Sequence, residues 1–360
     1  MKSAFKTVDE IQSETLVGMD LTQLTEVMRV AGEADYRARQ IYKWIYGKNV
    51  DSFQQLTNIP QSLRDWLESR FRLRSLQLEK EEESRDGTRK FLWKLIDGHR
   101  IESVLIPEGK RRTLCISSQV GCSFGCKFCA TGTMGLVRNL TPGEIVEQVL
   151  QVNKIMSSPV TNVVFMGMGE PFLNYPRVVQ ACKILNDPEG VAISNRRITI
   201  STSGVIPKIY QYTDDGLPYK LAISLHAPNQ ALREKIMPIA KKFPLDELIA
   251  GVKYYLDAKK QNRVTFEYVL LHGVNDSPRE ARQLISLLSP LRCKLNLIPC
   301  NQNFLGFQPP SPQQLEEFYT LMLKAPFAVT VRKNRGEDIT GACGQLAVEV
   351  QAKTIFMKEG

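Results

Sequence analysis

The sequence predicts an α/β protein, in which an incomplete barrel of six βα units follows a small helical domain and a β-hairpin linker. Six short runs rich in β-branched residues recur between residues 113 and 299, and a helix-like stretch follows each of them. Strands that alternate with helices form a parallel sheet, because a parallel connection has to cross back over the sheet. The length of 360 residues allows one large core and an accessory domain.

Residues 1–75 predict the helical accessory domain. Apolar residues recur there at intervals of three and four over 21–33, 36–47 and 58–71. Aromatic and basic side chains of the middle stretch are of the kinds that stack on RNA bases and contact phosphates. At helical spacing, Tyr42, Trp44 and Ile45 are more typical of a core, so we expect most of these side chains to be buried.

Residues 76–110 alternate between polar and apolar side chains and predict the β-hairpin linker, with Asp97-Gly98 as its turn. The main domain is predicted to cover 111–346 and to leave a tail over 347–360. Its six strands are expected over 113–120, 161–168, 196–203, 220–227, 263–271 and 294–299, with a further strand and a glycine-rich loop within 327–346.

One helix of the main domain has a well-marked start. Thr141 is a suitable N-cap, Pro142 occupies the first helical position, and Glu144 completes a capping box. This helix follows the first predicted strand, so the residues between the two form a loop at the carboxyl end of that strand. Ligands of parallel βα barrels gather at this end.

The composition favours a polyanionic partner and a reducing compartment. A net charge of +9 and a pI of about 9.1 suit nucleic acid, although a merely basic surface is the alternative. Eight cysteines are too sparse for a disulfide scaffold, and we infer the cytoplasm. The sequence shows no signal-peptide core and no stretch of membrane-spanning length, so we expect no membrane association.

Three cysteines in the loop after the first strand predict a metal centre. Cys122, Cys126 and Cys129 are spaced by four and then three residues. Three thiolates occupy three corners of a cubane iron-sulfur cluster and leave one iron open to a small molecule. Zinc is the alternative, although no second cysteine pair and no histidine lies near in the sequence. Spacing alone leaves both metals open.

Polar residues follow several of the other strands. The run 166–171 supplies a flexible backbone and Glu170 after the second strand, and further polar residues end the third, fourth and sixth strands. Each of them alone is more typical of a structural polar group. Because all of them point to one rim, together they predict a ligand pocket, and the residues are Ser201, Ser224, His226 and Asn301.

These motifs resemble the radical S-adenosylmethionine superfamily, in which the open iron of a 4Fe-4S cluster binds S-adenosylmethionine. Within it, the sequence is most similar to the family of bacterial methyltransferases that act on C2 of adenine in ribosomal and transfer RNA. The resemblance rejects zinc. The stretches that carry it are 126–132, 140–149, 163–171, 198–205, 221–229, 295–301 and 331–346.

The resemblance implies a role for each matching residue. Cys343 would be the methyl-carrying cysteine, Cys115 its transient disulfide partner, and Glu102 the proton acceptor. Cys182, Cys293 and Cys300 match no catalytic position. The cluster ligands would be Cys122, Cys126 and Cys129, and the residues in contact with S-adenosylmethionine would be Gly169, Glu170, Ser201, Ser224, Leu225, His226 and Asn301.

The implied reaction uses two molecules of S-adenosylmethionine and an S-methylcysteine intermediate. Adenine C2 has no lone pair to attack a methyl cation, so a radical route is needed. The implied partners are 23S rRNA, tRNA, and an electron donor such as flavodoxin with its reductase, with the enzyme as a monomer. The basic run 332–335 either holds RNA phosphates or is a solvated charged segment.

Two other functions remain as alternatives. A related enzyme methylates adenine C8 of the same rRNA nucleotide and confers ribosomal antibiotic resistance, and it shares the cysteine triad and both catalytic cysteines. The second alternative is a non-catalytic RNA-binding protein, in which the metal loop has only a structural role.

Overall fold

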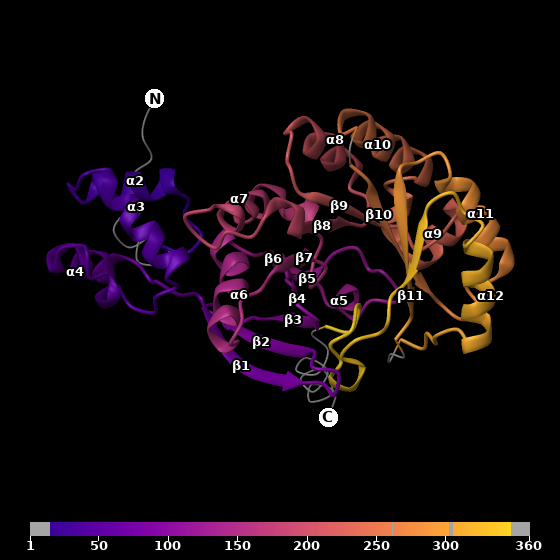
Figure 1. The fold of residues 1–360 in the computed structure, drawn as a ribbon, viewed down its shortest axis with the longest axis horizontal. Helices are drawn as coiled ribbons and strands as arrows, with labels where there is room; N and C mark the ends of the chain where they lie inside the picture. Colours follow the sequence, from indigo (N-terminus) through magenta and orange to yellow (C-terminus); the bar gives the residue numbers. More distant parts are fainter. Residues whose placement is uncertain (1–14, 261, 302–304, 347–360) are drawn as a thin grey trace.

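A curved sheet of ten strands forms the centre of the molecule (Figure 1). The structure, a computed structural model, describes residues 15–260, 262–301 and 305–346, so the predicted tail over 347–360 lies outside the described residues. The strands lie in the order β1-β2-β3-β4-β7-β8-β9-β10-β11-β12. They are β1 (Leu76–Glu83), β2 (Arg89–Leu95), β3 (Arg100–Glu108), β4 (Arg111–Cys115), β7 (Asn162–Phe165), β8 (Ile198–Thr202), β9 (Lys220–Ser224), β10 (Val264–Leu270), β11 (Cys293–Pro299) and β12 (Ala328–Val331).

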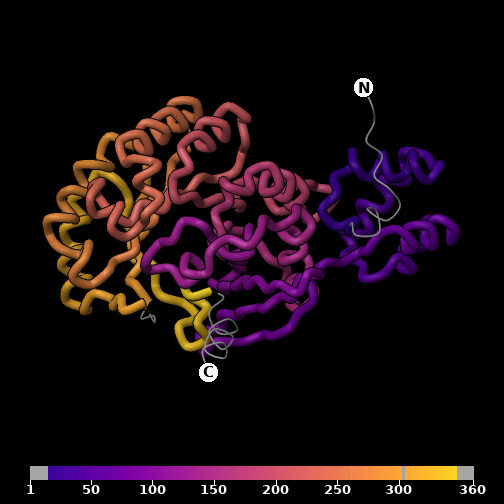
Figure 2. The backbone as a smooth tube through the Cα atoms, turned by 180° about the vertical axis from the view of Figure 1, so that it is seen from behind, coloured from indigo at the N-terminus to yellow at the C-terminus, as the bar shows by residue number. Residues whose placement is uncertain are grey.

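From β4 to β12 every neighbouring pair of strands is parallel, and helices cover the outer face of the sheet (Figures 1 and 2). The predicted partial barrel is therefore confirmed, and β12 is its further strand. None of the helices in the described part of the chain is long and apolar enough to cross a membrane. The helices around the barrel are α6 (Pro142–Ile155), α7 (Tyr175–Asn186), α8 (Ile206–Asp214), α9 (Gln230–Ile236), α10 (Leu245–Ala258), α11 (Pro278–Leu288) and α12 (Pro312–Met322).

The parallel strands alternate between buried apolar residues and residues that line open space inside the barrel. Successive side chains of a strand point to opposite faces, so one face packs against the helices while the other faces the interior. The interior is polar, unlike the packed aliphatic interior of many βα barrels. Fully buried examples are Leu114, Ile200, Leu221, Phe266 and Leu295, and their neighbours Thr113, Thr199, Lys220, Thr265 and Lys294 line a cavity.

The segment over 76–110 forms three antiparallel strands that extend the barrel sheet. The predicted turn at Asp97-Gly98 joins β2 to β3, as expected. A second turn at Asp86-Gly87 adds β1, which pairs with β2. Because β3 also pairs with β4, with Val104 opposite Cys115, these strands are continuous with the barrel. These three strands are therefore part of the main sheet, whereas the sequence predicted a hairpin that links two domains.

The first predicted strand, over 113–120, divides into two elements. β4 ends at Cys115, and the chain then leaves the sheet because Ser117 is held by other partners. Its N–H donates to Gln148 Oε1 at 2.8 Å, and its hydroxyl donates to the Glu102 carbonyl at 2.6 Å. The second half pairs in a separate two-stranded ribbon, β5 (Gln119–Cys122) with β6 (Gly135–Asn139), which encloses the cysteine loop and α5 (Ala130–Thr133).

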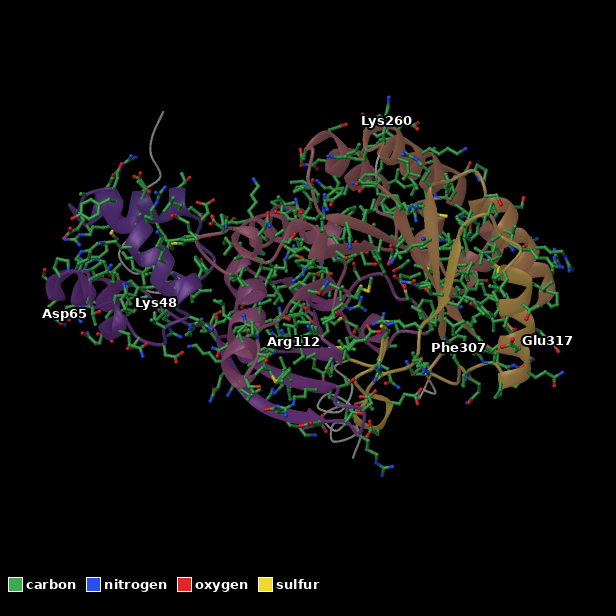
Figure 3. The ribbon with its side chains drawn as sticks, in the orientation of Figure 1. Lys48, Asp65, Arg112, Lys260, Phe307 and Glu317 are labelled. Carbon is green, nitrogen blue, oxygen red and sulfur yellow. The ribbon has the colours of Figure 1, made fainter. Side chains whose placement is uncertain are left out.

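The N-terminal residues form the predicted helices α2 (Leu21–Val30), α3 (Tyr36–Tyr42) and α4 (Gln61–Arg70), with a π-helical turn over Lys43–Gly47. Tyr42 and Ile45 are buried as expected, whereas Trp44 is half-buried. This helical unit packs beside α6: Glu147 accepts hydrogen bonds from both the N–H and the hydroxyl of Ser75, at 2.7 and 2.6 Å. Lys48 and Asp65 lie on it, at the opposite end of the molecule from Glu317 of α12 (Figure 3).

Candidate active site

A cavity of about 1090 Å³ opens at the carboxyl ends of the parallel strands. Leu225 is fully buried and does not line the cavity, although its N–H donates to the Glu267 carbonyl at 3.0 Å. The predicted residues that line it are Cys122, Cys126, Cys129, Gly169, Glu170, Ser201, Ser224, His226, Asn301 and Cys343.

The cysteine triad occupies one wall of this cavity, between β5 and α5. Burial raises the pKa of Cys122 to about 12 and raises the pKa of Cys126 well above its ordinary value. The charges of neighbouring cysteines raise these pKa values further. Burial also raises the pKa of Cys129, while backbone N–H groups of Gly132 and Thr131 counteract the rise by hydrogen bonding to its sulfur. Without a bound cation, therefore, the three side chains are neutral thiols.

This donor set fits an iron-sulfur cluster better than a single ion. Metal binding displaces thiol protons and supplies the positive charge that buried sulfurs lack. Each thiolate of a cubane binds a different iron, so the sulfur atoms do not need to converge on one point. No group of three or more His, Cys, Asp or Glu side chains in the described chain is arranged to hold a metal ion.

The turn after β7 is held by Glu170 and Gln119. The two carboxylate oxygens of Glu170 accept hydrogen bonds from the N–H groups of Phe172, at 3.0 Å, and Ser203, at 2.8 Å. Gly169 has a φ of +96°, and a Cβ there would lie 2.5 Å from the Gln119 side chain, so only glycine fits. Glu170 thus braces the turn of one strand against the end of the next, a role that sequence reasoning missed.

Polar groups also organise the ends of β8 and β9. The hydroxyl oxygens of Ser201 and Ser224 are 3.5 Å apart across the two strands. Arg233 is fully buried and donates to the carbonyls of Ser203 and Leu225, at 2.5 and 3.3 Å. His226 accepts a hydrogen bond from a backbone N–H at its Nδ1, and burial together with Arg233 lowers its pKa to about 3. It therefore faces the cavity as a neutral imidazole.

Two buried acceptors in the cavity wall lack a partner within the described residues. They are Glu267 Oε2 and Asn301 Oδ1. A buried acceptor without a donor is costly, about 1–3 kcal/mol, so such positions indicate where a ligand donates. S-adenosylmethionine carries an ammonium group, two ribose hydroxyls and an adenine amino group, and therefore fits this requirement. Asn301 was predicted as a ligand contact, whereas Glu267 was not.

Cys115 and Cys343 line a second cavity, of about 470 Å³, beside the first. Cys343 lines both cavities and is exposed, whereas Cys115 is buried at the end of β4. Burial, followed by the charge of Cys343, raises the pKa of Cys115 to about 12. Arg332 Nη1 lies 3.6 Å from the Cys343 sulfur and donates a hydrogen bond to it. The two cysteines are free thiols in this structure.

Glu102 lies outside both cavities, in the middle of β3. It is buried, and its carboxylate is 3.8 Å from Lys90 Nζ, which also donates to the Thr340 hydroxyl at 2.8 Å. Glu102 is therefore linked to the Cys343 loop through Lys90. The structure does not bring it beside the cysteine triad.

Sequence reasoning missed three residues that shape the site: Arg233, Glu267 and Arg332 as a neighbour of Cys343. The sequence contained an indication of Glu267 and Arg332. Glu267 is a charged residue within an otherwise apolar strand, and Arg332 directly follows such a strand, at positions that face the interior. Arg233 lies on α9 and has no comparable signal, because its partners are carbonyl groups of distant strands. Conversely, Cys182 and Cys293 are buried away from both cavities, and Cys300 lines the first.

Comparison with known proteins extends over nearly the whole chain. Residues 116–285 match the model of the radical SAM superfamily, and residues 15–73 match the N-terminal domain of ribosomal RNA large subunit methyltransferases. The dual-specificity RNA methyltransferase RlmN of Alcanivorax borkumensis is 42% identical over 353 residues, which are 95% of this chain and 92% of that protein. RlmN of Anaeromyxobacter dehalogenans is 44% identical over 91% of this chain and 90% of its own.

A solved structure agrees with these relatives. The crystal structure of a radical SAM methyltransferase from Sphaerobacter thermophilus has a TM-score of 0.89 and 43% sequence identity, and the match covers 92% of this chain and 99% of that one. Superfamily membership implies S-adenosylmethionine and a 4Fe-4S cluster as cofactors, and the relatives act on RNA. The chain belongs to the RlmN family of radical SAM RNA methyltransferases.

Proposed function

We propose that this chain methylates C2 of a specific adenosine in 23S rRNA and of the adenosine next to the anticodon in tRNA. The observation that carries the proposal is the position of Cys343 between two cavities. One cavity contains the cysteine triad and the other contains Cys115. A carrier that collects a methyl group at one site and is released by a second thiol needs this arrangement.

Each group of residues in the site has a separate role. Cys122, Cys126 and Cys129 hold the 4Fe-4S cluster, and Gly169, Ser201, Ser224, His226 and Asn301 surround S-adenosylmethionine. Bound together, these cofactors supply the methyl group for Cys343 and the radical that later removes a hydrogen atom from it. Arg332 donates a hydrogen bond to the Cys343 sulfur at 3.6 Å and so fixes the position of the methyl carrier.

Release of the product depends on Cys115. After the methylene group on Cys343 has bonded to adenine C2, enzyme and RNA are covalently joined. The adduct radical first gives up one electron and the C2 proton. Attack of the Cys115 thiolate on the Cys343 sulfur then forms a disulfide as the carbon–sulfur bond breaks, and the electron pair of that bond stays with the methylene carbon, which takes up a proton and becomes the methyl group. Burial keeps Cys115 protonated, since its pKa is about 12, so the thiol must lose its proton during the reaction. Glu102 was predicted to accept the substrate proton, and its distance from the cavities favours an indirect role through Lys90.

We also propose a monomeric, cytoplasmic enzyme that a flavodoxin and its reductase supply with electrons. The basic charge of the chain, +9, suits its RNA substrates.

Mass analysis of nucleosides from RNA incubated with the enzyme, S-adenosylmethionine and a reductant tests the proposal. We expect 2-methyladenosine in both RNAs. Recovery of 8-methyladenosine alone would instead identify the enzyme as the C8 methyltransferase.

The Cys343→Ala variant tests the carrier role. It should retain its fold and iron content but form no methyladenosine, because no thiol is left to accept the methyl group. Cys182→Ala, at a buried cysteine away from both cavities, is the matched control and should stay active. Unchanged methylation by Cys343→Ala would refute the carrier role, and zinc without iron in the anaerobically purified protein would refute the cluster.

A further inference from the structure

A third cavity lies inside the barrel, toward the amino ends of the strands and away from the active site. This cavity, of about 1600 Å³, is lined by residues at or near the beginning of β4, β7, β8, β9, β10 and β11, together with the end of β12 and the residues after it. The active-site cavity is lined by residues at the strand ends. Met166, Glu267 and Arg332 line both cavities and separate them. The amino-end part of the third cavity therefore lies on the opposite side of these three residues from the cysteine triad, while Lys333 and Arg335 connect the cavity to the second one.

Positive charge dominates this amino-end cavity. Seven arginine and lysine side chains line it, against two glutamates. Four of the cations come from four different strands or strand starts and form its outer layer: Arg111 begins β4, Arg197 precedes β8, Lys220 begins β9, and Lys294 is the second residue of β11. The acidic residue Glu108 pairs with Arg111 at 2.5 Å, and the other, Glu267, lies deeper in the barrel.

Few acidic groups compensate the remaining outer cations. Within the described residues, Arg197, Lys220 and Lys294 form no salt bridge within 4 Å, and Glu267 is the carboxylate on which the charge of Lys294 acts. The pKa of Lys220 is lowered by burial and then by the positive charges of Lys294, Arg111 and Arg196. Cations that repel one another around a concave surface bind an anion favourably, because the anion relieves their mutual repulsion.

We propose that the amino-end cavity is a phosphate-binding site, at which Lys220 and Lys294 with Arg197 and Arg111 hold an oligophosphate anion. The inference rests on the proposed function in one respect, because the RNA substrate would supply the phosphate groups that bind in this cavity. The RNA backbone would then be bound at the end of the barrel opposite the reacting adenosine. A free oligophosphate is the second source of the same chemistry.

RNA binding by the full-length protein tests the site. A tRNA transcript is titrated at several salt concentrations against wild type, Lys220→Gln/Lys294→Gln, and the charge-conserving Lys220→Arg/Lys294→Arg. Loss of two phosphate contacts should reduce the slope of log affinity against log salt by about 1.4, using the single-strand value of about 0.7 per contact. The arginine variant should keep the wild-type slope. Lys253→Gln/Lys324→Gln is the matched control, since both lysines are exposed and lie elsewhere, on α10 and after α12.

Binding of inorganic tripolyphosphate, measured by calorimetry, distinguishes the two sources. A reduced salt slope in the glutamine variant supports the RNA backbone as the occupant. If the glutamine variant keeps the wild-type salt slope for RNA but no longer binds tripolyphosphate, the phosphate-binding site is supported and its occupant is a free oligophosphate. The proposal is overturned if the glutamine variant matches wild type in both measurements, or if the control variant shows the same losses.

These measurements are independent of the methylation reaction. They need neither a reductant nor S-adenosylmethionine, because they measure binding alone. Failure of the proposed function would be seen instead as a wild-type enzyme that forms no methyladenosine.

Discussion

Arg332 shows how a single residue connects the parts of the site. It lines all three cavities, and its guanidinium lies 3.6 Å from the Cys343 sulfur. The charges of Cys343 and then of Glu267 raise its pKa against the effect of burial. From the sequence, Arg332 was the first member of a basic run with either an RNA-binding or a solvated role. Its position directs it toward Cys343, while Lys333 and Arg335 line the second and third cavities.

At the same scale, His226 should make stability depend on pH. Its pKa is about 3 in the folded chain and about 6.5 in an unfolded one, so between these values the unfolded state binds the additional proton. The free energy of unfolding should therefore fall as pH decreases from 6.5, by at most about 1.4 kcal/mol per pH unit from this residue. His226→Asn should remove this part of the slope, because asparagine tolerates the φ of +56° and does not titrate.

Urea unfolding between pH 5 and pH 7 measures the effect. An identical slope in His226→Asn and wild type would show that the imidazole is not held neutral.

At the scale of elements, the β5–β6 ribbon encloses the cysteine loop. Gly135 pairs with Cys122, and Leu136 pairs with Gly121, so the ribbon fixes Cys122, the first of the three proposed cluster ligands. Gly121 has a φ of +75°, and a Cβ at this position would lie 1.9 Å from the Gly135 carbonyl oxygen. No side chain fits between the two strands there. The geometry of the metal loop therefore depends on a backbone contact as well as on the cysteines.

Gly121→Ala should weaken cluster binding. We expect the clash to separate the two strands and to lower both the iron content after anaerobic reconstitution and the thermal midpoint. Gly98→Ala is the matched control, since Gly98 also has a positive φ but has open space around its Cα. The control should show only backbone strain, about 1–2 kcal/mol, and normal iron content. Equal iron content in both variants would contradict the role of the ribbon.

At the scale of the whole molecule, the antiparallel strands at one edge of the sheet hold the Cys343 loop at the other edge (Figures 1 and 2). The Asp338 carboxylate accepts hydrogen bonds from the Ser84 hydroxyl at 2.5 Å and from the Arg85 N–H at 3.2 Å. In the opposite direction, the Gly336 N–H of the loop donates a hydrogen bond to the Asp86 carboxylate at 3.2 Å. The loop thus lies against the turn between β1 and β2, and Cys343 shares a cavity with Cys115.

Removing this contact should affect the pairing of the two cysteines. In Asp338→Ala the loop loses two hydrogen bonds, so mild oxidation should give severalfold less Cys115–Cys343 disulfide than in wild type, as measured by peptide mass mapping. The control is Asp246→Ala, an exposed acidic residue in the first turn of α10. If both variants gave the wild-type yield, the antiparallel strands would not position the loop.

The sequence by itself determined the parts of this protein that depend on local patterns. The strand and helix periodicities, the Thr141 capping box, the turn at Asp97-Gly98 and the cysteine triad each occupy a short stretch whose propensity or spacing is readable directly. The polar residues at the strand ends were predictable because parallel strands present their carboxyl ends at one rim.

Only the tertiary structure decided which distant segments meet. It joined the three antiparallel strands to the barrel, placed Cys115 beside Cys343, removed Glu102 from the cavity, and aligned Arg197, Lys220 and Lys294 around the opposite mouth. These outcomes depend on strand register and on which polar groups find partners across the sheet. Local propensity does not contain that information, because each such contact involves residues far apart in the chain.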